Sequence, residues 1–332
     1  MHAVAVIGAG SFGTALAIHL ARRGAPTLLW GRDTDKLVAM AAARENSAYL
    51  PGCAFPPQLA TEADLARAVA GAEDLLIATP SHALRATLHQ LLPLLRPGQN
   101  LAAACKGLEP QTGKLVHEIA AEVFGDAHAL AVISGPTFAK ELGLGMPTAV
   151  TIASSDRPFA EKFARLLHGG GFRAYWSDDL VGVEIGGAAK NVMAIGVGIA
   201  DGLALGANIR AALITRGLAE MMRLATALGG KPETLMGLSG LGDLVLTCTD
   251  NQSRNRRMGL LLAQDKSVAD AIAEIREVVE GVKAAPELLR LAQQHGVEMP
   301  ITAAVSAVLD GSLSAVDAVR QLVTRPAKAE IP

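Results

Sequence analysis

The sequence is poor in cysteine and in aromatic residues, and neither sign of charge dominates it. Its 3 cysteines are far apart and form no C-x-x-C pair, which excludes the usual patterns of a zinc site, a dithiol redox centre or a disulfide framework. Aromatic residues make up 3% of the chain, too few for an aromatic platform that stacks nucleobases. Because 30 Lys and Arg residues balance 32 Asp and Glu residues, we expect no nucleic-acid partner.

The sequence also lacks a secretion signal and a long uninterrupted apolar run. No basic segment precedes apolar residues 3–7, and no cleavage-site pattern follows them. The longest apolar segment, residues 192–207, contains Asp201 and is too short and too rich in glycine to cross a bilayer. We therefore expect a cytoplasmic protein without a membrane span.

The length of the chain and its hydrophobic pattern predict two domains, because 332 residues exceed what one core usually holds. In residues 1–178, short apolar runs alternate with helical segments, which is typical of a Rossmann-like, doubly wound α/β domain with a mostly parallel sheet. In residues 179–332 the pattern is helical throughout, which predicts an all-α second domain. The predicted strands are residues 3–7, 27–31, 75–79, 100–105, 129–134, 149–153 and 173–176. The later predicted helices are residues 178–205, 208–228, 255–264, 268–275, 282–294, 301–309 and 315–323.

A glycine-rich turn joins the first predicted strand to the first predicted helix. A G-x-G-x-x-G match alone is weak evidence in a chain with 34 glycines. Its place between strand and helix is typical of a dinucleotide site: Gly8 permits the tight turn, Gly10 lets the backbone approach a pyrophosphate, and Gly13 lets the helix pack closely. The helix N-terminus would then face the phosphates. An ordinary glycine-rich turn is the alternative.

The residue after the second predicted strand indicates which dinucleotide binds. NAD sites usually carry an acidic residue there for the ribose hydroxyl, but this chain has Arg32. An arginine favours the 2′-phosphate of NADPH, whereas Asp33 keeps NADH compatible with the site. We predict NADPH or NADP as the preferred cofactor, with NADH or NAD also accepted, and a solvated surface arginine is the alternative.

Polar residues follow three later strands, at the edge where an open α/β sheet binds its ligand. Lys106 would reach a phosphate or a substrate oxygen, and His82 is a candidate acid. The turn at Gly135 and Thr137 offers backbone N–H groups and a hydroxyl. For His82 a loop-lining role, and for the turn an ordinary Gly-Pro turn, are the alternatives. Cys105 has no recognisable partner base, so we interpret it as a small buried residue rather than a nucleophile.

The helical half contains a lysine in an unusual setting. Gly186 and Gly187 lie inside a predicted helix, where each glycine costs about 1 kcal/mol relative to alanine. A close approach by another backbone or a ligand would compensate for that cost. Lys190 follows small, uncharged residues, an environment that lowers the pKa of a lysine and suits acid–base chemistry. A lysine that extends to the helix surface is the alternative.

Three more segments of the helical half carry polar groups suited to a ligand. Asp243 follows a glycine-flanked turn, where it would orient a lysine or a hydroxyl substrate, or else cap a helix. Residues 251–257 place three arginines and several amides beside Ser253 at a predicted helix start, which is typical of a phosphate site or of a basic surface loop. Residues 277–281 offer carboxylates to cofactor hydroxyls, and a solvated helix boundary explains them equally well.

The chain resembles the bacterial-type NAD(P)-dependent glycerol-3-phosphate dehydrogenases, because these motifs occur in the same order over nearly its whole length. The resemblance implies reversible reduction of dihydroxyacetone phosphate to sn-glycerol 3-phosphate, the precursor of the phospholipid backbone. A homodimer is expected from base rates alone. The segments that carry the resemblance are residues 8–13, 80–82, 105–108, 134–139, 189–191, 240–244, 253–255 and 279–281.

The resemblance also implies roles for individual residues and no metal. Lys190 would exchange the proton at the C2 oxygen, and Asp243 would assist it. At position 12 the family often has Trp or Tyr, and Phe12 keeps the size but loses the polar group. The implied cofactor contacts are Gly8, Gly10, Ser11, Phe12, Gly13, Arg32, Tyr49, Lys106, Ala139, Arg254, Val278 and Glu280. The implied substrate contacts are Lys106, Gly135, Thr137, Lys190, Asp243, Ser253, Arg254 and Asn255.

Two other functions remain compatible with the sequence. A hydroxy-acid dehydrogenase with the same two domains would need no phosphate site around Arg254. A non-catalytic NADPH-binding sensor would need neither Lys190 nor Asp243.

Overall fold

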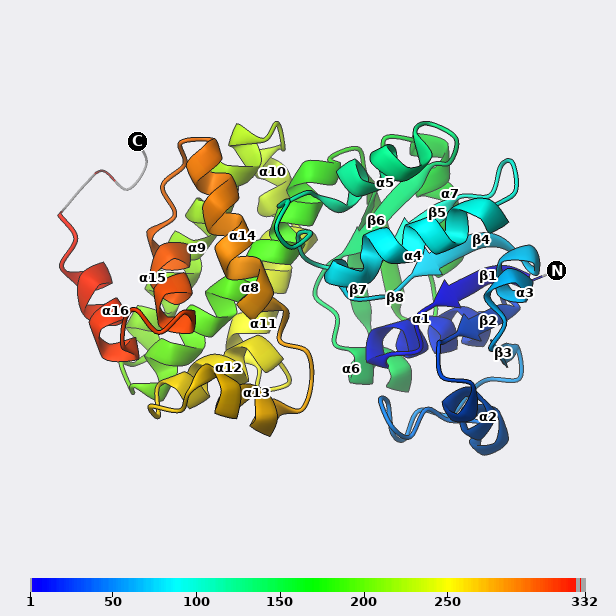
Figure 1. Cartoon of the computed structure of the whole chain (residues 1–332), viewed down its shortest axis with the longest axis horizontal. Coiled ribbons are helices and arrows are strands. Elements are labelled where there is room, and N and C mark those ends of the chain that lie inside the picture. Colours follow the sequence, from blue (N-terminus) through cyan, green and yellow to red (C-terminus); the bar gives the residue numbers. More distant parts are fainter. Residues whose placement is uncertain (1, 327–328, 330–332) are drawn as a thin grey trace.

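A computed structural model of the chain describes residues 2–326 and residue 329. It consists of a strand-containing half and a helical half (Figure 1). All strands of the described residues lie before residue 178, and only helices follow, which confirms the predicted fold class. The predicted second domain extends to residue 332, and its residues 327–328 and 330–332 lie outside the described ones.

The eight strands form one sheet in the order β3-β2-β1-β4-β5-β6-β7-β8. Neighbouring strands pair in parallel except β6 and β7, which are antiparallel. The chain runs outward from β1 in one direction and then in the other, so a ligand crevice is expected at the carboxyl end of β1. The strands are β1 (His2–Ile7), β2 (Thr27–Trp30), β3 (Leu59–Glu62), β4 (Ala72–Ile77), β5 (Leu101–Ala103), β6 (Leu130–Ser134), β7 (Thr148–Ala153) and β8 (Phe172–Ser177).

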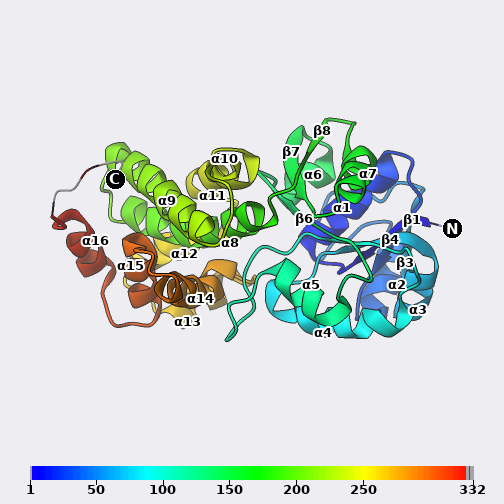
Figure 2. The same cartoon turned by 90° about the horizontal axis from the view of Figure 1, so that it is seen from above.

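Helices cover both faces of the sheet (Figure 2). Successive residues of β1 point to opposite faces and are buried on both: Val4 and Val6 join one hydrophobic core, and Ala5 and Ile7 join the other. The helices of this half are α1 (Ser11–Arg22), α2 (Thr34–Ala43), α3 (Leu65–Ala70), η1 (Ser81–Ala83), α4 (Leu84–Leu91), η2 (Leu92–Leu94), α5 (Val116–Phe124), α6 (Ala139–Leu144) and α7 (Arg157–Leu167).

The helical half is built around α8 (Leu180–Gly202). This helix is long and apolar enough to cross a membrane, but 83% of its apolar window is buried inside the protein, so it is a core helix. Glycines allow α8 and α12 to touch backbone to backbone, since a Cβ on Gly259 would lie 2.1 Å from the carbonyl oxygen of Ile195. The other helices are α9 (Ala207–Ala227), α10 (Pro232–Leu235), η3 (Leu238–Gly242), α11 (Asp243–Thr249), α12 (Arg254–Leu262), α13 (Val268–Ile275), α14 (Glu280–Gln294), α15 (Pro300–Leu309) and α16 (Ala315–Val323).

The structure corrects several predicted boundaries. β4 begins at Ala72 and ends at Ile77, so the predicted strand 75–79 was placed too late, and β5 is shorter than the predicted strand 100–105. The prediction missed β3, a four-residue strand between turns. It also missed η3 and α11, because the glycines of residues 237–242 indicated an open turn.

Candidate active site

Three charged side chains from distant parts of the chain meet between the sheet and α8. Lys190 of α8 donates hydrogen bonds from Nζ to the carboxylate of Asp243 and, over 3.0 Å, to the hydroxyl of Thr247. The second carboxylate oxygen of Asp243 accepts from Nζ of Lys106 over 2.8 Å. Lys106 also donates to the carbonyl oxygen of Gly135 over 3.1 Å. One buried carboxylate therefore holds two lysines, one from each half of the chain, and we call Lys106, Lys190 and Asp243 the lysine cluster.

Two adjacent glycines of α8, Gly186 and Gly187, explain how Lys190 reaches this position. A Cβ on Gly186 would lie 2.4 Å from the carbonyl oxygen of Ser239 in η3, and a Cβ on Gly187 would lie 2.9 Å from Oγ of Ser134 at the end of β6. Only glycine permits both approaches. The close contacts that compensate for the cost of glycine inside a helix are thus made with other parts of the chain, as predicted. These contacts bring Lys190 against the start of α11.

The environment of this cluster shifts the pKa values of Lys190 and Asp243. Burial, reinforced by the charge of Lys106 and opposed by that of Asp243, lowers the pKa of Lys190 to about 8. Burial alone raises the pKa of Asp243, but Lys106 and Lys190 outweigh it, so the net pKa of Asp243 is below its usual value. Lys190 is therefore poised to give up and regain a proton near neutral pH, beside a carboxylate that stays charged.

The glycine-rich turn after β1 leaves an open space in front of α1. Gly8 has a φ of +127°, and a Cβ there would lie 2.8 Å from the carbonyl oxygen of Ala78; a Cβ on Gly13 would lie 2.0 Å from the carbonyl oxygen of Gly8. By contrast, a Cβ on Gly10 would meet nothing within 4 Å, and no side chain caps α1. Packing thus requires Gly8 and Gly13, whereas Gly10 keeps room before the helix N–H groups. This arrangement fits a dinucleotide pyrophosphate.

Other predicted cofactor residues lie around this turn. Ser11 donates from Oγ to the carbonyl oxygen of Tyr49 over 2.7 Å, and Tyr49 is 48% exposed. The ring centroid of Phe12 lies 5.8 Å from Nζ of Lys106, which links the turn to the lysine cluster. Arg32 is exposed after β2, and Ala139 begins α6, which packs on α1.

The segment predicted to bind a phosphate, residues 251–257, leads into α12 and lies beside Asn191, the residue after Lys190. Ser253 is the N-cap of α12, since its hydroxyl accepts from the backbone N–H of Arg256 over 3.2 Å. Asn255 donates from Nδ2 to Oδ1 of Asn191 over 2.8 Å. Arg254 is half exposed, and its Nη1 lies 3.5 Å from the carboxylate of Glu277. The segment thus lies at the rim of the lysine cluster and carries a partly exposed cation.

The start of α14 completes this rim. The backbone N–H of Gly281 donates to Oδ1 of Asn255 over 2.9 Å, and Glu280 accepts from Nδ2 of Asn191 over 3.4 Å. Burial raises the pKa of the Glu280 carboxyl, although Arg254, Lys190 and nearby Lys106 oppose this. Val278, just before α14, is 44% exposed.

Some sequence-based candidates lie outside the lysine cluster, and two polar residues beside the cluster were missed. The hydroxyl of Thr137 bonds to that of Thr148 over 3.0 Å, and His82 lies beside Lys283 rather than beside Lys190. The missed residues are Asn191 and Thr247. Thr247 follows Asp243 by four residues, a spacing that puts both on one helix face once the segment is recognised as helical.

Cys105 fits its interpretation as a buried structural residue. Its side chain is 5% exposed, and burial raises the pKa of its thiol to about 12. A thiol with that pKa stays protonated near neutral pH and is a poor nucleophile.

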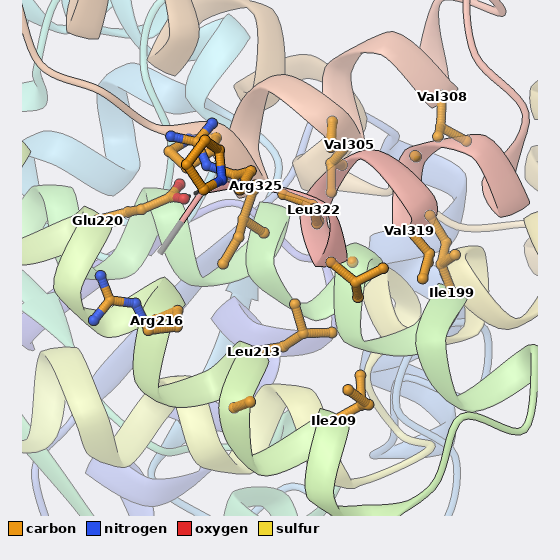
Figure 3. Close-up of a pocket in the computed structure, with 18 of the residues that line it drawn as sticks. Ile199, Ile209, Leu213, Arg216, Glu220, Val305, Val308, Val319, Leu322 and Arg325 are labelled. Carbon is orange, nitrogen blue, oxygen red and sulfur yellow. Dashed lines mark hydrogen bonds between the residues drawn. The ribbon is translucent and has the colours of Figure 1, made fainter. Parts of the chain in front are cut away.

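A cavity of about 470 Å³ lies apart from this cluster, between α8, α9, α15 and α16 (Figure 3). Aliphatic side chains line most of it, with Glu220 at one end. Glu220 accepts hydrogen bonds from the backbone N–H groups of Ile301 and Thr302, so its carboxylate serves the start of α15. The cavity contains no member of the lysine cluster, so it is separate from the candidate active site.

A dinucleotide turn next to a buried lysine with a lowered pKa defines a nicotinamide-dependent dehydrogenase. Family models confirm this class and make it specific: the N-terminal model of NAD-dependent glycerol-3-phosphate dehydrogenase matches residues 3–160, and the C-terminal model matches residues 179–320. The chain belongs to this family and is an oxidoreductase that uses NAD(P).

Individual relatives cover the full length of the chain. It is 54% identical to glycerol-3-phosphate dehydrogenase [NAD(P)+] of Pseudoalteromonas translucida, over 99% of this chain and 98% of the relative. The crystal structure of glycerol-3-phosphate dehydrogenase from Coxiella burnetii superposes with a TM-score of 0.94 at 45% identity, covering 98% of this chain and 99% of that one. D-mandelate dehydrogenase is 14% identical with a TM-score of 0.61, over 93% of this chain and 98% of that one, and shares the fold alone.

Proposed function

We propose that this protein reversibly reduces dihydroxyacetone phosphate to sn-glycerol 3-phosphate, with NADPH as the preferred reductant and NADH as a second one. The observation that carries the proposal is the pair of lysines on one buried carboxylate beside the dinucleotide turn. The bound nicotinamide supplies or takes up the hydride. Family membership supports the further proposals that the enzyme is a cytoplasmic homodimer and that its product feeds phospholipid synthesis.

In this proposal Lys190 moves the proton at the substrate C2 oxygen. A charged lysine has three N–H donors, of which Asp243 and Thr247 take one each, so the third is available to the substrate. Asp243 fixes the direction of Nζ, and the charge of Lys106 helps to keep the pKa of Lys190 low enough for proton release. The geometry thus suits both directions of the reaction.

The direct test is a spectrophotometric assay of the purified full-length protein with dihydroxyacetone phosphate and either NADPH or NADH. We expect oxidation of both cofactors, with a higher kcat/KM for NADPH. A protein that oxidises neither cofactor would contradict the proposal, and a higher kcat/KM for NADH would contradict the assigned role of Arg32.

Arg254→Ala tests the phosphate-binding role of the α12 start. We expect KM for dihydroxyacetone phosphate to rise by roughly 10–100-fold, because a hydrogen bond between charged groups contributes about 1.5–3 kcal/mol. Arg257→Ala is a matched control, since Arg257 also lies beside Glu277, at 3.2 Å. An unchanged KM for Arg254→Ala, measured by steady-state kinetics, would exclude Arg254 from phosphate binding.

The pKa of about 8 for Lys190 predicts opposite pH profiles for the two directions. Reduction needs the charged lysine as acid, so kcat/KM should fall as pH rises through about 8. Oxidation needs the neutral lysine as base, so kcat/KM should rise through the same pH. Parallel profiles in the two directions would rule out Lys190 as the titrating group.

A further inference from the structure

Three basic side chains from separate elements gather at the edge of the cofactor crevice and form what we call the basic cluster. Arg32 follows β2, His82 lies in η1 after β4, and Lys283 lies in α14. Nζ of Lys283 is 3.3 Å from Nδ1 of His82. Because β2 and β4 both pair with β1, the segments that follow them flank the turn that begins at Gly8.

The basic cluster has no acidic partner among residues 2–326. All three side chains are exposed, and neither Arg32 nor Lys283 forms an ion pair with a carboxylate there. Partial desolvation of the exposed His82 ring and the charges of Lys283 and Arg32 lower the pKa of His82, which suits a neutral ring that accepts an N–H from Lys283. Positive charge that is gathered without counter-charge attracts an anion.

Both sides of the contact between His82 and Lys283 are fixed to the active site. On the sheet side, a Cβ on Gly107 would lie 2.7 Å from Oγ of Ser81, so η1 packs on the loop that carries Lys106. On the helical side, a Cβ on Gly281 would lie 2.7 Å from the carbonyl oxygen of Asn191, so the first turn of α14 packs on α8 next to Lys190. The contact therefore bridges the two halves at the mouth of the site.

We propose that Lys283 and His82, together with Arg32, bind a phosphate group of the adenosine half of the dinucleotide and so hold α14 against the sheet over the cofactor. The proposal rests on the proposed function for the class of cofactor. The phosphate is either the 2′-phosphate, next to Arg32, or a 5′-phosphate, next to the turn. Lys283 and His82 act by binding and positioning, and they take no part in proton transfer.

Calorimetric titration of the full chain with 2′,5′-ADP and with 5′-ADP tests this site without turnover. We expect Lys283→Met to weaken binding by about 10-fold, as for the loss of one charge-assisted hydrogen bond, and Lys283→Arg to retain it. A loss confined to 2′,5′-ADP assigns the 2′-phosphate, and an equal loss with both ligands assigns a 5′-phosphate. Unchanged binding of both ligands to Lys283→Met overturns the proposal.

Controls separate this site from general charge and from the proposed function. Arg320→Met removes a positive charge on α16, at the far end of the helical half (Figure 1), and should bind both ligands as the wild type does. Wild-type reduction of dihydroxyacetone phosphate is measured in parallel. If the wild type does not reduce dihydroxyacetone phosphate but its ligand binding depends on Lys283, the proposed function is wrong and the phosphate site is supported. If the wild type reduces dihydroxyacetone phosphate but ligand binding does not depend on Lys283, the proposed function is supported and the phosphate site is wrong.

Discussion

Lys190→Met should reduce kcat by about 10²–10⁴-fold in both directions, the usual contribution of a general acid or base, with NADPH affinity nearly unchanged. Methionine preserves the length and apolar stem of a side chain that is 8% exposed, so α8 should pack as before. Asp243 retains Lys106 as its counter-ion at 2.8 Å, which limits the cost of leaving that carboxylate buried. Steady-state kinetics and NADPH titration would measure the two effects separately.

Two further variants make this prediction specific. Lys190→Arg keeps the positive charge, but a guanidinium does not lose its proton in proteins, so oxidation of sn-glycerol 3-phosphate should stay abolished. Lys231→Met removes an exposed lysine that pairs with Asp178 over 2.7 Å and should turn over normally. Wild-type turnover by Lys190→Met would remove Lys190 from the mechanism.

Elements with a regular hydrophobic period were predictable from the sequence, whereas short elements without a clear period were not. Helices 268–275 and 315–323 were predicted to the residue, because each has an apolar stripe of helical period after a Ser N-cap. β3 has only four residues and one fully buried side chain, which gives no clear period. The helix α11 was missed because the glycines before it, of which Gly240 lies against the backbone of Leu235 in α10, look like an open turn.

The sequence identified individual residues of the site but not which of them contact one another. Lys106 and Asp243 are separated by 137 residues and carry no shared pattern, so their common ion pair is visible only in the folded chain. Gly186 and Gly187 were the exception, since their cost inside a helix predicted a close contact near Lys190. Lys283 gave no signal, because a single lysine on an amphipathic helix is usually a solvated surface group.

Asp243→Asn should have the second large effect and should act through the pKa of Lys190. Without the carboxylate, burial and repulsion from Lys106 remain, and both lower the pKa of Lys190 further below about 8. A larger fraction of Lys190 would then be neutral at neutral pH. Reduction, which needs the charged lysine, should therefore lose about 10²-fold or more in kcat, and oxidation should lose less.

The shape of the pH profile distinguishes this effect from simple loss of structure. For Asp243→Asn the inflection of kcat/KM in the reduction direction should move to lower pH than in the wild type. Thr247→Val removes the 3.0 Å hydrogen bond to Lys190 without changing any charge, so its rate should fall while its inflection stays in place. Removing one partner of a buried ion pair lowers the free energy of unfolding by about 3–5 kcal/mol. In Asp243→Asn, proton release by Lys190 removes the unpaired charge and so reduces part of this loss of stability. An inflection that stays at the wild-type pH in Asp243→Asn would show that Asp243 does not set the pKa of Lys190.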